Sequence, residues 1–351
     1  MIRRISQGSS SRNLRISGEG RASGVISTAG LCEVVSEQRY LSWTWRLIST
    51  KGHAWLEVDS QSPPAIDKVK NADLERYKDM HFIAGPSTDE FRRAIPFASD
   101  ATKESLREAY ASFSSQWWPA TKQSPEIIVA ASHALRHGDL GIRAERVVLS
   151  GLSQTGGVAR RFATHSSHLR LPDGALPFDA LIPCQSGGEA LPDIPGVKII
   201  ELLGESEFQS VRLLCGVGGQ TIGTSHRRPE SDSFRLYEVA GMAHRESRYA
   251  SELDKVHWSV AELYGARWST FSNSFIYHAV FEAVERWTGK HAVSPPPSTF
   301  LTTVDDSDTI LRDEHGNAVG GVRTVHSDVP LARLVAATPK GRPNWYWGKL
   351  I

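Results

Sequence analysis

The sequence lacks several features that would assign it to common classes of protein. No run of about eighteen or more apolar residues occurs, so we expect no membrane span. The formal net charge is only +1, so no overall field would recruit nucleic acid. The three cysteines, Cys32, Cys184 and Cys215, are widely spaced and odd in number, which favours free thiols over a disulfide framework. No CxxC or HExxH motif occurs, and no GxGxxG follows a predicted strand, so we expect no metal and no cofactor.

The first 23 residues also lack something, namely the apolar core of a secretory signal. They carry five arginines, six serines and one acid. We therefore expect a cytoplasmic protein with a disordered segment at 1–23, although Arg- and Ser-rich, acid-poor composition is also how a transit peptide looks. The rest of the chain, at 40% hydrophobic and 23% charged over the whole sequence, has the composition of a globular protein.

Short apolar runs alternate with helical patterns along the chain, which predicts a mostly parallel sheet flanked by helices. Strands are predicted at 24–35, 53–61, 144–151, 197–207 and 234–244, and helices at 40–52, 103–118, 124–138 and 272–290. This order favours a single α/β domain over residues 24–351. The Gly-, Arg- and Ser-rich stretch near 208–232 interrupts the pattern and is predicted to be an insertion over a site, and 294–351 is predicted to be a loop-rich C-terminal extension.

One strand, "AERVVLSG", runs into "LSQTGG", which places Ser153 at a predicted strand-to-helix turn. A nucleophilic serine on such a turn usually lies in G-x-S-x-G, because a tight turn needs small neighbours. Here Gly151 is present, Thr155 replaces the second glycine, and Gly156 and Gly157 follow. The alternative is an ordinary loop serine that caps the next helix.

Potential partners of the serine follow in the order acid, then histidine, each after a predicted strand. Glu205 and Glu207 follow "KIIELLG", and His244 follows "FRLYEVAGMA". A histidine can take the serine proton and return it to a leaving group, while an acid orients the imidazole. We favour Glu207 as the acid because a short turn separates it from the strand, with Glu205 as the alternative. Asp179 is a weaker candidate because it precedes a strand.

The strings "GLSQTGG", "GESEF", "YEVAGMAH" and "LRDEHGNAVGGVRTVHSDVPLARLV" together resemble a family of largely uncharacterised bacterial and fungal α/β-hydrolase esterases. That family's elbow reads G-x-S-Q-S-G, its acid motif S-E-T-D and its histidine string E-V-A-G-x-A-H. The resemblance implies that Ser153 is the nucleophile, that Glu207 matches the acid, and that His244 is the base. It covers roughly residues 40–335 and implies an α/β-hydrolase fold.

The likeness is weakest at the N-terminus, because only 51 residues precede the "GHAW" strand and they match poorly. We expect a truncated start or missing edge strands there, which bears on the oxyanion hole. One donor is expected to be the backbone N–H of Gln154, the residue after the nucleophile. The second is expected from the loop after the first predicted strand, with Ser36 and Glu37 as candidates.

These features predict a serine hydrolase that cleaves a small or medium carboxylic ester through an acyl-enzyme. The partner is a small-molecule ester, with no nucleic acid, and oligomeric state is left open. The alternative is a non-catalytic α/β-hydrolase-fold binding protein, disabled by a short N-terminus. A lyase or transferase with the same triad is a third reading.

Overall fold

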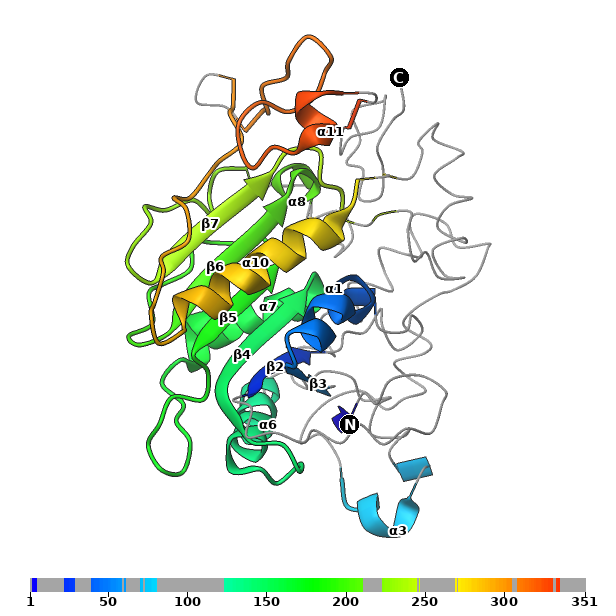
Figure 1. Cartoon of the computed structure of the whole chain (residues 1–351), viewed down its shortest axis with the longest axis vertical. Coiled ribbons are helices and arrows are strands. Elements are labelled where there is room, and N and C mark those ends of the chain that lie inside the picture. The colour runs from blue at the N-terminus through cyan, green and yellow to red at the C-terminus, as the bar shows by residue number, and fades with distance from the viewer. Residues whose placement is uncertain are drawn as a thin grey trace, which may run out of the picture.

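The computed structural model describes residues 2–4, 22–28, 39–58, 60, 70–71, 73–80, 123–210, 223–244, 246, 269, 271–304, 308–330 and 333–334. The predicted helix at 103–118 and residues 211–222 of the predicted insertion lie outside this set. Within it, helices cover both faces of one twisted sheet (Figure 1).

The sheet has seven strands among the described residues, in the order β1-β3-β2-β4-β5-β6-β7. The strands are β1 (Ile2–Arg4), β2 (Ala22–Thr28), β3 (Ala54–Val58), β4 (Ala144–Leu152), β5 (Ala180–Cys184), β6 (Lys198–Gly204) and β7 (Phe234–Val239). Only the β1–β3 pair is antiparallel. The carboxyl ends of β4, β6 and β7 therefore lie along one edge, where ligands bind in open α/β sheets. The predicted α/β class is confirmed.

The N-terminal part of the chain contributes strands to this sheet. β2 pairs with both β3 and β4 and so occupies an internal position. β1 lies within the segment 1–23 that was predicted to be disordered, and pairs along the outer edge of β3. A strand of only three residues is too short to show alternation, so its pairing depends on the edge that β3 offers. The continuation of the predicted strand 24–35 beyond Thr28 lies outside the described residues.

Alternating side chains of β4 enter two separate cores. Val148 packs with buried residues of α1 and α10, whereas Val147 and Leu149 pack with those of α6 and α7. This division follows from the two-residue period of a strand. The helices are α1 (Arg39–Thr50), α3 (Leu74–Tyr77), α6 (Ser124–His137), α7 (Gln154–Arg161), the π-helical turn η2 (Phe162–Ser166), α8 (Glu205–Ser210), α10 (Asn273–Trp287) and α11 (Val325–Asp328). No described helix is long and apolar enough to cross a bilayer.

Helix α6 shows how local signals set its ends. Gly138 follows the last turn with φ 83°, a left-handed conformation that glycine adopts without strain. Pro125 lies in the first turn, where its missing N–H costs no intrahelical bond. Ser124 is the first helical residue, and its hydroxyl donates to the carbonyl of Ser60 at 2.7 Å.

The C-terminal extension packs beside β7. Thr299 and Val322 form isolated parallel bridges with Tyr237 and Val239. Three buried tail residues then pack against Phe208 and Ala240 near the site: Leu301, Ile310 and Ala318. In Figure 1 the last described helix, α11, lies beyond the carboxyl ends of β6 and β7. The predicted loop-rich extension therefore covers the strand ends from which side chains project into the candidate site.

Candidate active site

Ser153 lies on a strained turn between β4 and α7. Its φ of 59° and ψ of −121° are unusual for a residue with a side chain, and among the described residues only Gln185 shares a positive φ without being glycine. Such a conformation costs about 1–3 kcal/mol and persists where the surroundings enforce it. The turn is held by the N–H of Ser153, which donates to the carbonyl of Cys184 at 2.9 Å. The Ser153 hydroxyl makes no cap hydrogen bond to α7, unlike the loop serine of the alternative reading.

Glycines at two positions let the turn pack tightly. A Cβ at Gly151 would lie 2.2 Å from the carbonyl oxygen of Thr155, and one at Gly156 would lie 2.6 Å from that of Cys184. A Cβ at Gly157 would meet only the end of the flexible Arg161 side chain, at 3.6 Å. In the usual G-x-S-x-G motif the second glycine occupies the position of Thr155. Here the position that has no room for a side chain is Gly156, one residue later.

Thr155 occupies the position of the second glycine of G-x-S-x-G, and its hydroxyl is hydrogen-bonded within the turn. Thr155 Oγ1 accepts a hydrogen bond from the N–H of Leu152 at 2.8 Å and donates to the carbonyl of Leu152 at 2.8 Å. Burying a hydroxyl costs little when it is paired in this way. Serine, which the resembling family carries here, has the same hydroxyl.

The structure brings three predicted residues into one hydrogen-bonded chain. Ser153 Oγ lies 2.8 Å from Nε2 of His244, and Nδ1 of His244 lies 2.5 Å from Oε1 of Glu207. His244 and Glu207 are buried, which excludes water that would compete for these bonds. The distance between His244 and Glu207 is short for a hydrogen bond from nitrogen to oxygen.

The two glutamates of α8 have different partners. Glu207 also accepts from the N–H of Gly204 and the hydroxyl of Ser206, both at 2.8 Å. Glu205 accepts from the N–H of Gly241 at 3.0 Å and from Arg312 at 2.6 Å. Residues two apart on a helix point in nearly opposite directions, so only one of the pair can face His244.

Asp179, the weaker candidate acid, lies at the opposite end of the sheet. It precedes β5, and its Oδ2 accepts from Arg136 at 2.6 Å and from the N–H of Val147 at 2.7 Å. Because β5 runs parallel to β4, its amino end is remote from the turn that follows β4. The structure does not bring Asp179 to the site.

The candidate oxyanion donors are only partly described. Gln154 is the first residue of α7, so its backbone N–H has no acceptor within the helix and lies at the positive end of the helix dipole. Ser36 and Glu37 lie outside the described residues. No group of three or more His, Cys, Asp or Glu side chains that could hold a metal ion occurs among the residues described.

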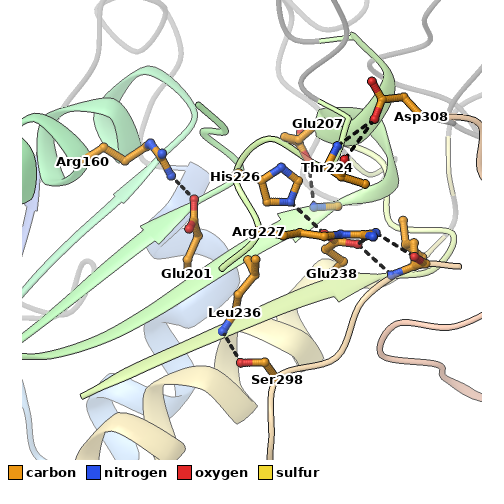
Figure 2. A network of polar contacts seen from close by, with 12 residues as sticks. Arg160, Glu201, Glu207, Thr224, His226, Arg227, Leu236, Glu238, Ser298 and Asp308 are labelled. Atoms are coloured by element: carbon orange, nitrogen blue, oxygen red, sulfur yellow. Dashed lines mark hydrogen bonds and ion pairs between the residues drawn. The ribbon is translucent and has the colours of Figure 1, made fainter. Parts of the chain in front are cut away.

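A buried polar network adjoins α8, and the sequence reasoning did not anticipate it (Figure 2). Glu238 of β7 accepts from Nε2 of His226 at 2.7 Å, from Arg227 at 2.8 Å and from the N–H of Leu301 at 2.7 Å. Burial alone would raise the pKa of Glu238, but the hydrogen bonds from His226 and Arg227 outweigh it and hold the pKa below its ordinary value. The network joins β7 to His226 and Arg227, which precede it in the chain, and to Leu301 of the C-terminal tail.

A second buried ion pair lies beneath the helix that follows the serine. Arg160 of α7 pairs with Glu201 of β6 (Figure 2) and also donates to the carbonyl of Glu189. Burial lowers the pKa of Arg160 to about 10, although the negative charge of Glu189 acts to raise it. Since that value is still far above neutrality, Arg160 stays charged, and its bonds to Glu201 and Glu189 fasten α7 to the sheet.

A parallel sheet with a serine on a strained strand-to-helix turn defines the α/β-hydrolase class of fold. The model of the family described as "Alpha/beta hydrolase domain" matches residues 35–349, and the chain belongs to this family. The membership predicted from the sequence motifs is thereby confirmed.

Among solved structures, the chain is similar to a Klebsiella pneumoniae subsp. pneumoniae protein described as "Putative Dienelactone Hydrolase". The two are 12% identical with a TM-score of 0.32, over 71% of this chain and 88% of that one. At that distance the substrate of the other protein says nothing about the substrate here. A comparison with curated proteins gave no match.

Proposed function

We propose that this chain is a serine hydrolase that cleaves small or medium carboxylic esters, with Ser153 as nucleophile, His244 as general base and acid, and Glu207 as the orienting acid. One observation carries the proposal: the continuous chain from Ser153 Oγ through both nitrogens of His244 to Glu207. A serine hydroxyl is a weak nucleophile until a positioned base removes its proton. Membership of an α/β-hydrolase family supports the same chemistry.

In the proposed reaction, Ser153 Oγ attacks the ester carbonyl carbon while His244 Nε2 takes the hydroxyl proton. The negative charge that develops on the carbonyl oxygen would be stabilised by the backbone N–H of Gln154. His244 then returns the proton to the leaving alkoxide as the ester C–O bond breaks, which leaves an acyl-enzyme. Water, activated in the same way, releases the acid and restores Ser153.

Glu207 has two tasks in this scheme. Its carboxylate holds the Nδ1 proton of His244, which selects the tautomer whose Nε2 can accept a proton, and it stabilises the imidazolium that forms. The N–H of Gly204 and the hydroxyl of Ser206 fix the carboxylate itself. Glu205 is committed to Arg312 and Gly241, which supports a structural task for it.

The proposal is tested by labelling the purified full chain with a fluorophosphonate, which reacts with activated serines. We expect wild type to be labelled and Ser153→Ala to be unlabelled, with ester turnover lower by a factor on the order of 10⁶. Ser132→Ala is a matched control, because Ser132 is buried on α6 and its hydroxyl donates to the carbonyl of Pro177. This control should be labelled like wild type.

A panel of esters, thioesters, lactones and amides with matched acyl groups then tests the bond type. Fastest turnover on the esters would support the proposal that carboxylic esters are the substrates. A folded wild type that is neither labelled nor active on any member of the panel would favour the non-catalytic binding protein instead.

A further inference from the structure

Gln185 is the second described residue, besides Ser153, that combines a side chain with a positive φ, here 46°. It directly follows β5, as Ser153 directly follows β4. A buried glutamine gains nothing locally from this conformation, so long-range contacts must enforce it.

Those contacts are specific to the amide group. Gln185 Nε2 donates to the carbonyl of Ala243 at 3.0 Å, and Oε1 accepts from the hydroxyl of Tyr277 at 2.5 Å. The carbonyl of Ala243 can only accept, so the amide has one possible orientation. The backbone N–H of Gln185 donates to the carbonyl of Leu202 on β6 at 2.7 Å, which anchors the residue to the neighbouring strand.

Gln185 thereby joins the serine turn to the histidine loop. Ala243 immediately precedes His244, so its carbonyl belongs to the peptide that places the imidazole. Cys184, immediately before Gln185, accepts the N–H of Ser153 at 2.9 Å. Two consecutive residues at the end of β5 therefore hold the backbone on both sides of the bond between Ser153 and His244.

The Gln185 side chain and the acid both approach Gly204. A Cβ placed on Gly204 would lie 2.8 Å from Oε2 of Glu207, 3.3 Å from Nε2 of Gln185 and 2.6 Å from the carbonyl of Met242. The absence of a side chain at position 204 is what lets these groups converge. Asn273 of α10 gives the carbonyl of Ala243 a second donor at 3.0 Å.

We propose that Gln185 is a positioning residue of the active site, which holds the Ala243 carbonyl and so fixes His244 Nε2 against Ser153 Oγ. This inference rests on the proposed function of the same site. Gln185 bonds the carbonyl of the residue before His244, so it acts through the histidine loop. A misplacement of about 1 Å in such a pair costs up to about 10² in rate, whereas substrate binding need not change.

The test uses variants that separate the amide from the strained backbone. Gln185→Met keeps the length of the side chain and removes both amide hydrogen bonds, and Gln185→Gly removes them while relieving the positive φ. We expect both to lower kcat and the rate of fluorophosphonate labelling by about 10- to 10²-fold with nearly unchanged KM. If Gln185 served folding alone, Gln185→Gly and Gln185→Met would leave kcat at the wild-type value in samples that remain folded, and that result would overturn the proposal.

A second pair of variants tests the tyrosine that orients the amide. Tyr277→Phe removes the hydroxyl that bonds Gln185 and should lower kcat severalfold. Tyr237→Phe is the matched control, because Tyr237 of β7 donates an equivalent bond to the carbonyl of Pro296 at 2.6 Å rather than to Gln185. It should keep wild-type kcat, and equal effects of the two substitutions would contradict the positioning role.

A readout independent of turnover distinguishes failure of this inference from failure of the proposed function. The proton that links His244 Nδ1 to Glu207 can be followed by NMR in the full chain. We expect it to be sharp in wild type and in Tyr237→Phe, and broadened or lost in Gln185→Met. A wild type that is not labelled by the fluorophosphonate would contradict the proposed function. The NMR resonance of the His244 Nδ1 proton tests the positioning role separately, and if it stays sharp in Gln185→Met, that role is overturned.

Discussion

Arg312 of the C-terminal tail donates a 2.6 Å hydrogen bond to Glu205, which lies two residues before the carboxylate that contacts His244. The other oxygen of Glu205 accepts the N–H of Gly241, in the turn that leads to His244. A single buried carboxylate thus ties the tail, helix α8 and the histidine loop together. Arg312 lies more than 60 positions after His244 in the sequence, so the C-terminal tail helps to hold the site.

Removal of Arg312 should destabilise the protein through Glu205. Arg312→Met removes the cation that donates to the fully buried Glu205 carboxylate, and breaking a buried pair in this way typically costs about 3–5 kcal/mol. Chemical denaturation measures the loss. Lys51→Met, which breaks an exposed ion pair with Glu285, should cost less than about 1 kcal/mol. Similar losses in the two variants would show that the tail is not fastened through this pair.

The two glutamates of α8 should respond differently to substitution by glutamine. Glu207→Gln removes the charge that holds the His244 Nδ1 proton, and we expect kcat to fall by about 10³–10⁴. Glu205→Gln keeps the shape but weakens the bond to Arg312, so its main effect should be on stability, with a fall in kcat of less than about tenfold. Steady-state kinetics and denaturation of both variants check this, and the reverse pattern would exchange their roles.

Neighbouring glycines of the serine turn should differ in their tolerance of a methyl group. Gly156→Ala places a Cβ 2.6 Å from the carbonyl of Cys184, where backbone must move, so we expect loss of labelling at Ser153 and a lower melting temperature. Gly157→Ala has room, and it should be neutral or stabilise α7 by about 0.5–1 kcal/mol. Thermal unfolding and fluorophosphonate labelling measure both effects. A tolerated Gly156→Ala would refute the packing argument.

The hydroxyl of Thr155 should matter more than its methyl group. Thr155→Ser keeps both bonds to Leu152 and should retain near-wild-type kcat and stability. Thr155→Val keeps the shape but leaves the N–H of Leu152 without this acceptor, a loss of about 1–3 kcal/mol. Denaturation curves of the two variants are directly comparable. Equal stability of Thr155→Val and wild type would mean that the hydroxyl bonds contribute nothing net.

The buried cluster at Glu238 should make stability depend on pH. The pKa of Glu238 is held low in the folded protein by the hydrogen bonds of His226 and Arg227, which outweigh burial. Its contribution is therefore complete above the ordinary glutamate pKa of about 4.3 and is lost as pH falls through the lower folded value. Glu238→Gln should cost about 3–5 kcal/mol at neutral pH and flatten this acid limb.

Denaturation at a series of pH values from about 7 to about 3 measures how the free energy of unfolding falls on the acid side. Glu282→Gln is the control, because Glu282 is exposed and pairs only loosely with Lys51 at 3.7 Å. It should keep the wild-type slope. An unchanged acid limb in Glu238→Gln would show that Glu238 does not titrate differently in the folded and unfolded states.

Much of the fold followed from local sequence. The apolar run 147–149, the small residues around Ser153 and the glycine at 138 predict a strand, a sharp turn and a helix end, because each depends on neighbouring residues alone. The order serine, acid, histidine after successive strands predicts one site, because parallel strands share a carboxyl edge. The three-residue strand β1 gave no such pattern, since the edge of β3 supplies its bonds.

The sequence by itself determined the α/β class and the short set of residues that could form the site, with both Glu205 and Glu207 among them. Only the tertiary structure decided which glutamate faces His244, that Gln185 and Tyr277 reach the histidine loop, and that Arg312 of the tail neutralises Glu205. The physical reason is that these bonds join residues 37 to 107 positions apart. Their partners are set by helix rotation and packing, which no local pattern of residues specifies.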